Sequence, residues 1–229
     1  MGIGQRDRRS EEQATDLTTL GDVARTYFGH RSPHVILSGL AVALFARFLV
    51  GTYGLADIVV LVVTLSLVGV VEWLIHLFLL HAPDDSFRER RLKTASGHRE
   101  HHLDPANVGW LMLAPTDAGA FLLMLLVWNL TWPLLIAWVL GASLLSTYLT
   151  AVAASYLMLA NYEWTHLLVH TRYRPKLGYY KRLVAHHRLH HFRNEHHWLG
   201  ITSRLGDKAL GTLPGSKSDV PLSDTARTL

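Results

Sequence analysis

Four apolar stretches run through this chain, and they restrict it to a helical fold embedded in a membrane. Residues 35–53 and 56–76 form the first two, with a Gly-Thr-Tyr-Gly turn between them, and residues 118–169 are apolar almost throughout. Because a membrane-spanning helix needs roughly 20 apolar residues, the long stretch accommodates two spans with a turn near residues 141–143. Pro133 then lies inside the third span and is expected to kink it.

The composition agrees with four spans and a polar portion outside the membrane. An alternative break at residues 129–133 would leave the third span too short to cross. The mean hydropathy of +0.18 exceeds that of an ordinary soluble domain but is too low for a chain made only of spans. We therefore expect an all-α integral membrane protein with four transmembrane helices and a helical cap.

The basic residues lie almost entirely on one side of these spans. All Lys and Arg residues except Arg47 fall before residue 34, between residues 82 and 116, or after residue 171. The positive-inside rule therefore places these segments, the cap and both termini in the cytoplasm. Arg47 lies inside the first span, and we expect it to snorkel outward or to meet an acidic partner.

Three regions are expected along the chain. Residues 1–34 form a cytoplasmic segment with an amphipathic helix over residues 16–29, which either lies on the membrane surface or packs on the cap. Residues 35–211 form the membrane domain. Residues 212–229 are rich in Pro, Gly and Ser, and we expect a disordered tail there.

Histidine makes up 15 of the 229 residues, and most of these histidines lie in four clusters on the cytoplasmic side. Residues three or four apart share a helix face, so the histidines within each of three clusters can converge on a metal. The first pair is five residues apart and would point about 140° apart on an unbroken helix, so we expect its second member to follow the helix end before Pro83. The ten candidate ligands are His76, His81, His98, His101, His102, His166, His170, His187, His190 and His191.

Ten imidazoles are too many for one metal ion and supply about five nitrogens to each of two. The chain has no cysteine, so nitrogen and oxygen atoms must hold any metal. A five-coordinate site with one open position suits oxygen activation, whereas a closed tetrahedral set would indicate structural zinc. Imidazole serves iron, copper and zinc alike, so redox chemistry with two iron ions and dioxygen as co-substrate would depend on iron supplied by the cell. Purified protein can carry zinc instead, because zinc binds such sites more tightly than ferrous iron.

Carboxylates accompany the clusters. Glu72 lies one turn before His76, and Glu163 lies three residues before His166. A carboxylate within a membrane is costly, and imidazole ligands commonly donate their second N–H to one. We expect both to orient ligands, with direct metal ligation as the rival role. Further candidates for a contact with metal, ligand or substrate are His186, Glu195, His196, His197 and Asp207.

The ordered set of motifs resembles the fatty acid hydroxylase superfamily of membrane di-metal oxygenases. The segment Tyr-Glu-Trp-Thr-His at residues 162–166 is similar to a segment of fatty acid and ceramide 2-hydroxylases, and residues 187–192 with 198–212 resemble their closing signature. The resemblance covers about residues 35–212 and all ten histidines. It implies a four-helix membrane base, a helical cytoplasmic cap and hydroxylation of an acyl chain with dioxygen.

The expected function is that of a membrane-bound di-iron oxygenase that hydroxylates a C–H bond of a lipid acyl chain. Its expected partners are the membrane, the lipid substrate and a separate electron-donor protein, because the first 34 residues cannot form the haem carrier domain that is fused to several relatives. Desaturation of a lipid or sterol is the alternative within enzymes. A metal-binding or transport protein is the alternative outside them, although its ligands would lie nearer the bilayer midplane. Nucleic-acid binding has no support, because the basic residues follow the membrane face.

Overall fold

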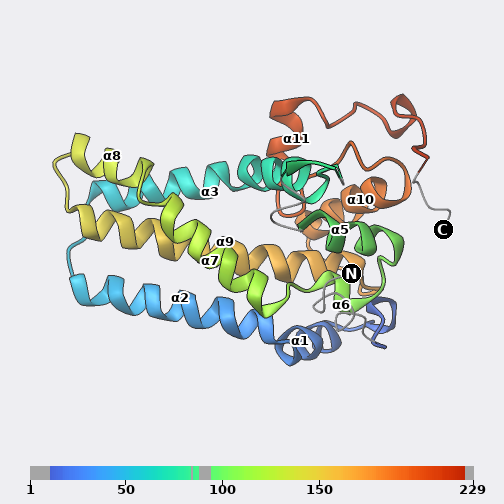
Figure 1. The fold of residues 1–229 in the computed structure, drawn as a ribbon, viewed down its shortest axis with the longest axis horizontal. Helices are drawn as coiled ribbons and strands as arrows, with labels where there is room; N and C mark the ends of the chain where they lie inside the picture. Colours follow the sequence, from blue (N-terminus) through green and yellow to red (C-terminus); the bar gives the residue numbers. More distant parts are fainter. Residues whose placement is uncertain (1–10, 84, 88–93, 225–229) are drawn as a thin grey trace. The chain divides into compact units, whose positions relative to one another are not determined.

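The computed structural model describes residues 11–83, 85–87 and 94–224 (Figure 1). These residues form helices and loops, and their one strand-like contact is an isolated bridge between Gln13 and Asn107. The expected all-α class is therefore confirmed. Two compact units are present, which we call the histidine unit (Met1–Tyr27, Gly69–Met112 and Trp164–Leu229) and the span unit (Phe28–Val68 and Leu113–Glu163).

Four segments are long and apolar enough to cross a membrane, which is the expected number of spans. They cover Arg31–Val50, Leu55–Leu80, Val108–Val139 and Leu144–His170. Their helices are α2 (Arg31–Val50), α3 (Leu55–Ile75), α6 (Val108–Leu111), α7 (Pro115–Trp128), α8 (Trp132–Val139) and α9 (Leu144–His170). The other helices are α1 (Leu20–Gly29), α5 (Thr94–Leu103), α10 (Gly178–Phe192) and α11 (Leu205–Leu210), with 3-10 turns at Ala14–Asp16 and Lys217–Asp219.

The third span is broken into two helices, and Pro133 does not kink a continuous one as expected. Pro133 lies in the first turn of α8, where its missing N–H breaks no hydrogen bond. The break is stabilised by the buried amide of Asn129, which donates to the Leu125 carbonyl at 2.7 Å and to the Ser155 hydroxyl at 3.1 Å. The turn expected before the fourth span is present, with Gly141 at a φ of +60°.

Arg47 meets an acidic partner inside the span unit. Its guanidinium lies 3.2 Å from the carboxylate of Asp57, and its Nε donates to the Thr150 hydroxyl at 2.8 Å. Asp57 also accepts hydrogen bonds from Thr150 at 2.6 Å and from Ser146 at 3.0 Å. This buried network joins α2, α3 and α9, so it fixes three spans to one another.

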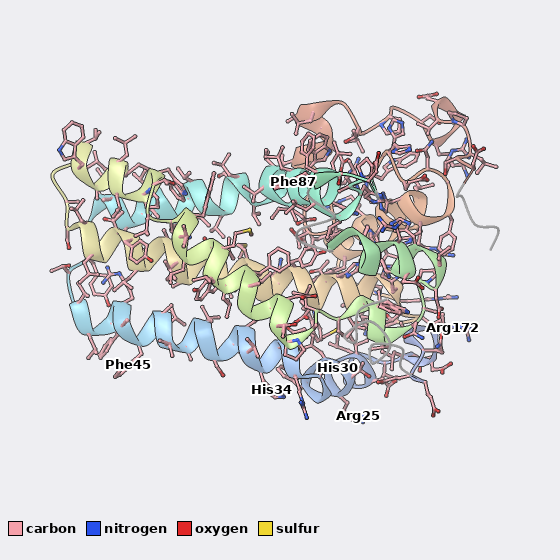
Figure 2. The ribbon with its side chains drawn as sticks, in the orientation of Figure 1. Arg25, His30, His34, Phe45, Phe87 and Arg172 are labelled. Carbon is pink, nitrogen blue, oxygen red and sulfur yellow. The ribbon has the colours of Figure 1, made fainter. Side chains whose placement is uncertain are left out.

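The span unit has a mixed core of small and large side chains and presents many large apolar ones outward. Ile36 of α2 and Ala118 of α7 are fully buried and share a core with Ala160 of α9. By contrast, Phe45 is 63 % exposed and points away from α2 (Figure 2). An exposed apolar surface of this kind on spans of sufficient length is what contact with lipid chains requires.

The helix expected over residues 16–29 is α1, and its buried face packs within the histidine unit. Val23 and Tyr27 join a core that includes Val108 and Leu168. That α1 also lies on the membrane surface stays a prediction.

The tail differs from the disorder expected over residues 212–229, as far as it is described. Val220 is buried, and its carbonyl accepts a hydrogen bond from the Arg193 side chain at 2.7 Å. The Ser223 amide donates to the Arg193 carbonyl at 2.9 Å. The low hydrophobicity of this segment did not reveal these contacts with the end of α10. Residues 225–229 lie outside the described part of the chain.

Candidate metal centre

A π-helical turn over His76–Leu80 brings the first two candidate ligands together. In this turn the amide of His81 donates to the carbonyl of His76, five residues back, at 3.0 Å. The two rings consequently stack, with centroids 5.0 Å apart. We expected His81 to lie beyond the end of the helix. In the structure the helix instead widens, and this aligns His81 with His76. Such turns are rare and are frequent at functional sites.

The other eight candidate ligands come from three helices of the histidine unit. Spacings of three and four residues place them on shared helix faces, and Figure 2 shows nitrogen atoms gathered between α5 and α10. Helix α5 contributes His98, His101 and His102, the end of α9 contributes His166 and His170, and α10 contributes His187, His190 and His191.

The ten imidazoles form two groups of five. The first group is His76, His81, His98, His102 and His190, whose ligating nitrogens all lie within 4.8 Å of one another. The second group contains His101, His166, His170 and His187 by the same measure. His191 joins it, because its Nε2 lies 3.1 Å from that of His101 and 3.0 Å from that of His187.

Hydrogen bonds alone do not account for these nitrogen contacts. The Nε2 atom of His98 lies 3.0 Å from that of His76, 3.2 Å from that of His81 and 3.1 Å from that of His102. A neutral imidazole has one N–H and one lone pair, so a hydrogen on His98 can serve only one of the three neighbours. A cation in the middle of the group would instead accept a lone pair from every Nε2. The donor set of each group therefore fits a metal ion such as iron, copper or zinc.

Backbone carbonyls fix the tautomer of several candidate ligands. The Nδ1 of His190 lies 2.9 Å from the carbonyl oxygen of His197, and that of His166 lies 3.2 Å from the carbonyl oxygen of Leu111. His76 makes the corresponding bond to Leu199. A carbonyl only accepts, so each Nδ1 must carry the hydrogen, and each Nε2 directs a lone pair into its group.

Outside the membrane-spanning segments, burial keeps the candidate ligands neutral. It lowers the pKa of His81 to about 4. Burial, and then repulsion from neighbouring imidazoles, also hold the pKa well below its ordinary range in His98, His101, His187, His190 and His191. A neutral imidazole is the form that binds a metal, so all six are in the ligating state at pH 7.

Glu72 bonds to a loop and not to an imidazole. Its carboxylate accepts hydrogen bonds from the amides of Ile201 and Thr202 and from the Thr202 hydroxyl. These residues follow Leu199, whose carbonyl accepts from His76. Glu72 therefore affects His76 through the loop, which differs from the direct contact expected.

Asp207 and His186 hold the same loop from its other side. The fully buried carboxylate of Asp207 accepts from the Leu199 and Gly200 amides, each at 2.8 Å, and lies 2.9 Å from Nε2 of His186. Burial alone would raise the pKa of Asp207, but hydrogen bonds from His186 and then Thr212 outweigh it and lower that pKa. Neither residue belongs to the two imidazole groups, and both support the loop that carries Leu199.

Sequence reasoning missed this loop, which we call the 198–202 loop. Trp198 has a φ of +54°, which is uncommon for a residue with a side chain. A Cβ at Gly200 would lie 1.9 Å from the Ser203 carbonyl oxygen, so the position requires glycine. The carbonyl of Leu199 carries no signal in a one-letter sequence, although the Trp-Leu-Gly run beside a histidine motif could have indicated a tight turn.

The remaining candidates lie in varied surroundings. Glu163 accepts a hydrogen bond from the Leu113 amide at 3.0 Å, and its orientation of a ligand stays a prediction. His197 contributes its backbone carbonyl to His190. The His196 side chain is 69 % exposed and lies 3.7 Å from Glu195. Neither residue belongs to an imidazole group, but both act electrostatically on His81.

Known proteins with similar sequences are hydroxylases of acyl chains. A dihydroceramide fatty acyl 2-hydroxylase of Arabidopsis thaliana is 35 % identical over 154 residues, which cover 65 % of this chain and 57 % of the relative. The fatty acid 2-hydroxylase of Homo sapiens is 31 % identical over 151 residues, which cover 65 % of this chain and 38 % of the relative. The chain thus spans little more than half the length of the first relative and less of the second. No solved structure shows a significant match.

A family model extends this likeness across the candidate centre. The model describes the fatty acid hydroxylases and matches residues 59–212, a range that contains all ten histidines of the two groups and the 198–202 loop. The match covers more than half of the 229 residues. The protein therefore belongs to the fatty acid hydroxylase family.

Proposed function

We propose that the protein is a membrane-bound hydroxylase that uses two iron ions and dioxygen to oxidise a C–H bond of a lipid acyl chain. The observation that carries this proposal is the pair of five-imidazole groups, with neutral nitrogens directed inward. The names of the relatives support an acyl chain as the substrate. Bound iron would supply the redox chemistry that activates dioxygen at such nitrogen-rich sites.

The chain's own residues hold and shield this centre. The two groups of five imidazoles would bind the two ions, and the carbonyls of Leu199, His197 and Leu111 keep three of the rings in the correct tautomer. Glu72 and Asp207 fix the 198–202 loop, so the direction of the Leu199 carbonyl is set before any metal binds. Burial of most of these side chains excludes bulk water from the reacting bond.

The arrangement of charge supports a cytoplasmic site that draws its substrate from the bilayer. The basic residues flank the spans on the side that carries the histidines, which favours cytoplasmic termini and a cytoplasmic cap. Insertion of one oxygen atom of dioxygen into a C–H bond consumes two electrons and two protons and releases water. A separate protein would supply the electrons, and the lipid would enter laterally between the spans.

An isotopic experiment tests this function. Purified protein in lipid nanodiscs receives iron, a chemical reductant and labelled dioxygen, and lipids are analysed by mass spectrometry. We expect one labelled oxygen atom in a new hydroxyl group on an acyl chain. Label arriving only from water, or turnover without a reductant, would contradict the oxygenase function. A new double bond without label would identify the desaturase alternative.

A further inference from the structure

A cavity of about 680 Å³ opens in the histidine unit beside the second imidazole group. Its wall includes the imidazoles of His170, His187 and His191. Four cationic side chains also line it, and no carboxylate from the described residues does so. The four are Arg172, Arg174, Lys181 and Arg188. The cavity therefore joins a cationic opening to the edge of the proposed metal centre.

The segment that follows α9 makes one side of this opening strongly positive. All four cations are exposed, and Figure 2 shows Arg172 at the outer edge of the histidine unit. Residues 171–193 contain seven Lys or Arg residues and no Asp or Glu. Leu177 lies in the same segment and is 66 % exposed. A cationic surface with an exposed apolar residue is typical of a docking site for an acidic protein.

The cavity lies at the end of the fourth span. Helix α9 has 27 residues, which extend about 40 Å at a rise of about 1.5 Å per residue. The hydrocarbon core is only about 30 Å thick. The cavity is lined by the last residues of α9 and by the loop that follows it, so its opening is accessible to a soluble protein.

We propose that this opening, with its rim of Arg172, Arg174, Lys181 and Arg188, is the docking surface for an acidic one-electron carrier protein. The inference rests on the proposed function, because hydroxylation consumes two electrons that a reductant must supply. Two reduced carriers dock in succession, and each is oxidised by one electron at the edge formed by His170, His187 and His191. Together they supply two electrons, which reduce dioxygen to one hydroxyl oxygen and one water with two protons from solvent and the two electrons of the oxidised C–H bond.

A binding measurement tests the surface without any turnover. The iron-loaded protein is placed in nanodiscs of zwitterionic lipid, and the probe is a fluorescently labelled acidic [2Fe–2S] ferredoxin. The double variant Arg172→Glu and Arg174→Glu should weaken binding at least tenfold at low salt. The matched control is the double variant Lys208→Glu and Lys217→Glu, which has the same change in net charge at exposed sites outside the cavity. Its affinity for ferredoxin should stay within about twofold of that of the wild type. Salt should weaken the wild-type complex. Equal affinities in all three proteins would overturn the proposal.

A comparison of reductants separates this inference from the proposed function. With ferredoxin as reductant, the hydroxylation rate of the Arg172→Glu and Arg174→Glu variant should fall relative to that of the wild type. This fall should be at least tenfold larger than the fall measured with dithionite and a viologen mediator. If the wild type gives no product with either reductant, the oxygenase function fails, and the difference in ferredoxin affinity still decides the docking surface. A last measurement, made with nanodiscs of anionic lipid, tests whether the surface binds the membrane instead of a protein. If the variant loses affinity for anionic lipid but keeps its affinity for ferredoxin, the surface binds the membrane and the proposal is wrong.

Discussion

Asp207 is connected to His76 through a single residue. The carboxylate of Asp207 accepts a hydrogen bond from the amide of Leu199 at 2.8 Å, and the carbonyl of Leu199 accepts one from His76. Glu72 holds the next part of the same loop through Thr202. Two buried carboxylates therefore set the orientation of one imidazole without touching it, which makes the 198–202 loop part of the centre.

Replacing Asp207 by Asn should loosen this loop. The Leu199 and Gly200 amides bond to different oxygens of this carboxylate. An Asn side chain has only one accepting oxygen, so one of the two buried amides loses its acceptor, at a cost of about 1–3 kcal/mol in the free energy of unfolding. Metal content should fall as well, because the Leu199 carbonyl is no longer fixed. Thermal unfolding and elemental analysis measure both effects. Asp219→Asn, which alters an exposed capping box, is the control, and equal losses in the two variants would refute the role of Asp207.

Gly200→Ala should be more damaging than a glycine substitution elsewhere. A Cβ at this position would lie 1.9 Å from the carbonyl oxygen of Ser203, so the backbone of the loop must move. Gly119 of α7 has nothing within 4 Å of the corresponding position, and Gly119→Ala should be neutral or stabilising by up to about 1 kcal/mol. Melting temperatures and metal content of the two variants provide the comparison. Similar melting temperatures would mean that the 198–202 loop adapts easily.

The metal-free protein should lose stability as the pH falls below about 6.5, the ordinary pKa of histidine. In the folded state the pKa of His81 is about 4, and those of His98, His101 and His190 are held well below their ordinary range. In this window the unfolded chain binds protons that the folded chain does not, so acid favours unfolding. The loss due to His81 should be complete near pH 4. Melting curves of metal-free protein between pH 7.5 and 4.5 test this, and a melting temperature that does not fall would contradict it.

Arg47 should contribute far more to stability than an exposed arginine. Arg47→Ala leaves the largely buried carboxylate of Asp57 without its cation, which costs up to about 3 kcal/mol because Thr150 and Ser146 still donate to it. Arg25 also pairs with a carboxylate, that of Asp22, but its side chain is 79 % exposed, and Arg25→Ala should cost less than about 1 kcal/mol. Unfolding in detergent by denaturant titration gives both values. Equal small losses would mean that the network between α2, α3 and α9 is not structural.

The sequence predicted what depends on periodicity and composition. Apolar length predicted the four spans, and histidine spacing predicted which clusters could converge. It did not predict how His76 and His81 would align, because no characteristic pattern of residues distinguishes a π-helical turn from an α-helix. Nor did it reveal Leu199, since any residue can offer a backbone carbonyl. Asp207 and His186 were named as candidates, but their partners are far apart in sequence, and only the folded chain shows that they support a loop.

Metal content tests the central claim most directly. Wild-type protein purified in detergent and supplied with iron should contain about two metal ions per chain, because each group of five imidazoles would bind one. His190→Ala should lower this number and abolish turnover. His34→Ala should leave both unchanged, since His34 bonds to the Phe28 carbonyl in the span unit and belongs to neither imidazole group. Wild-type protein that hydroxylates lipid with close to no bound metal would contradict the account.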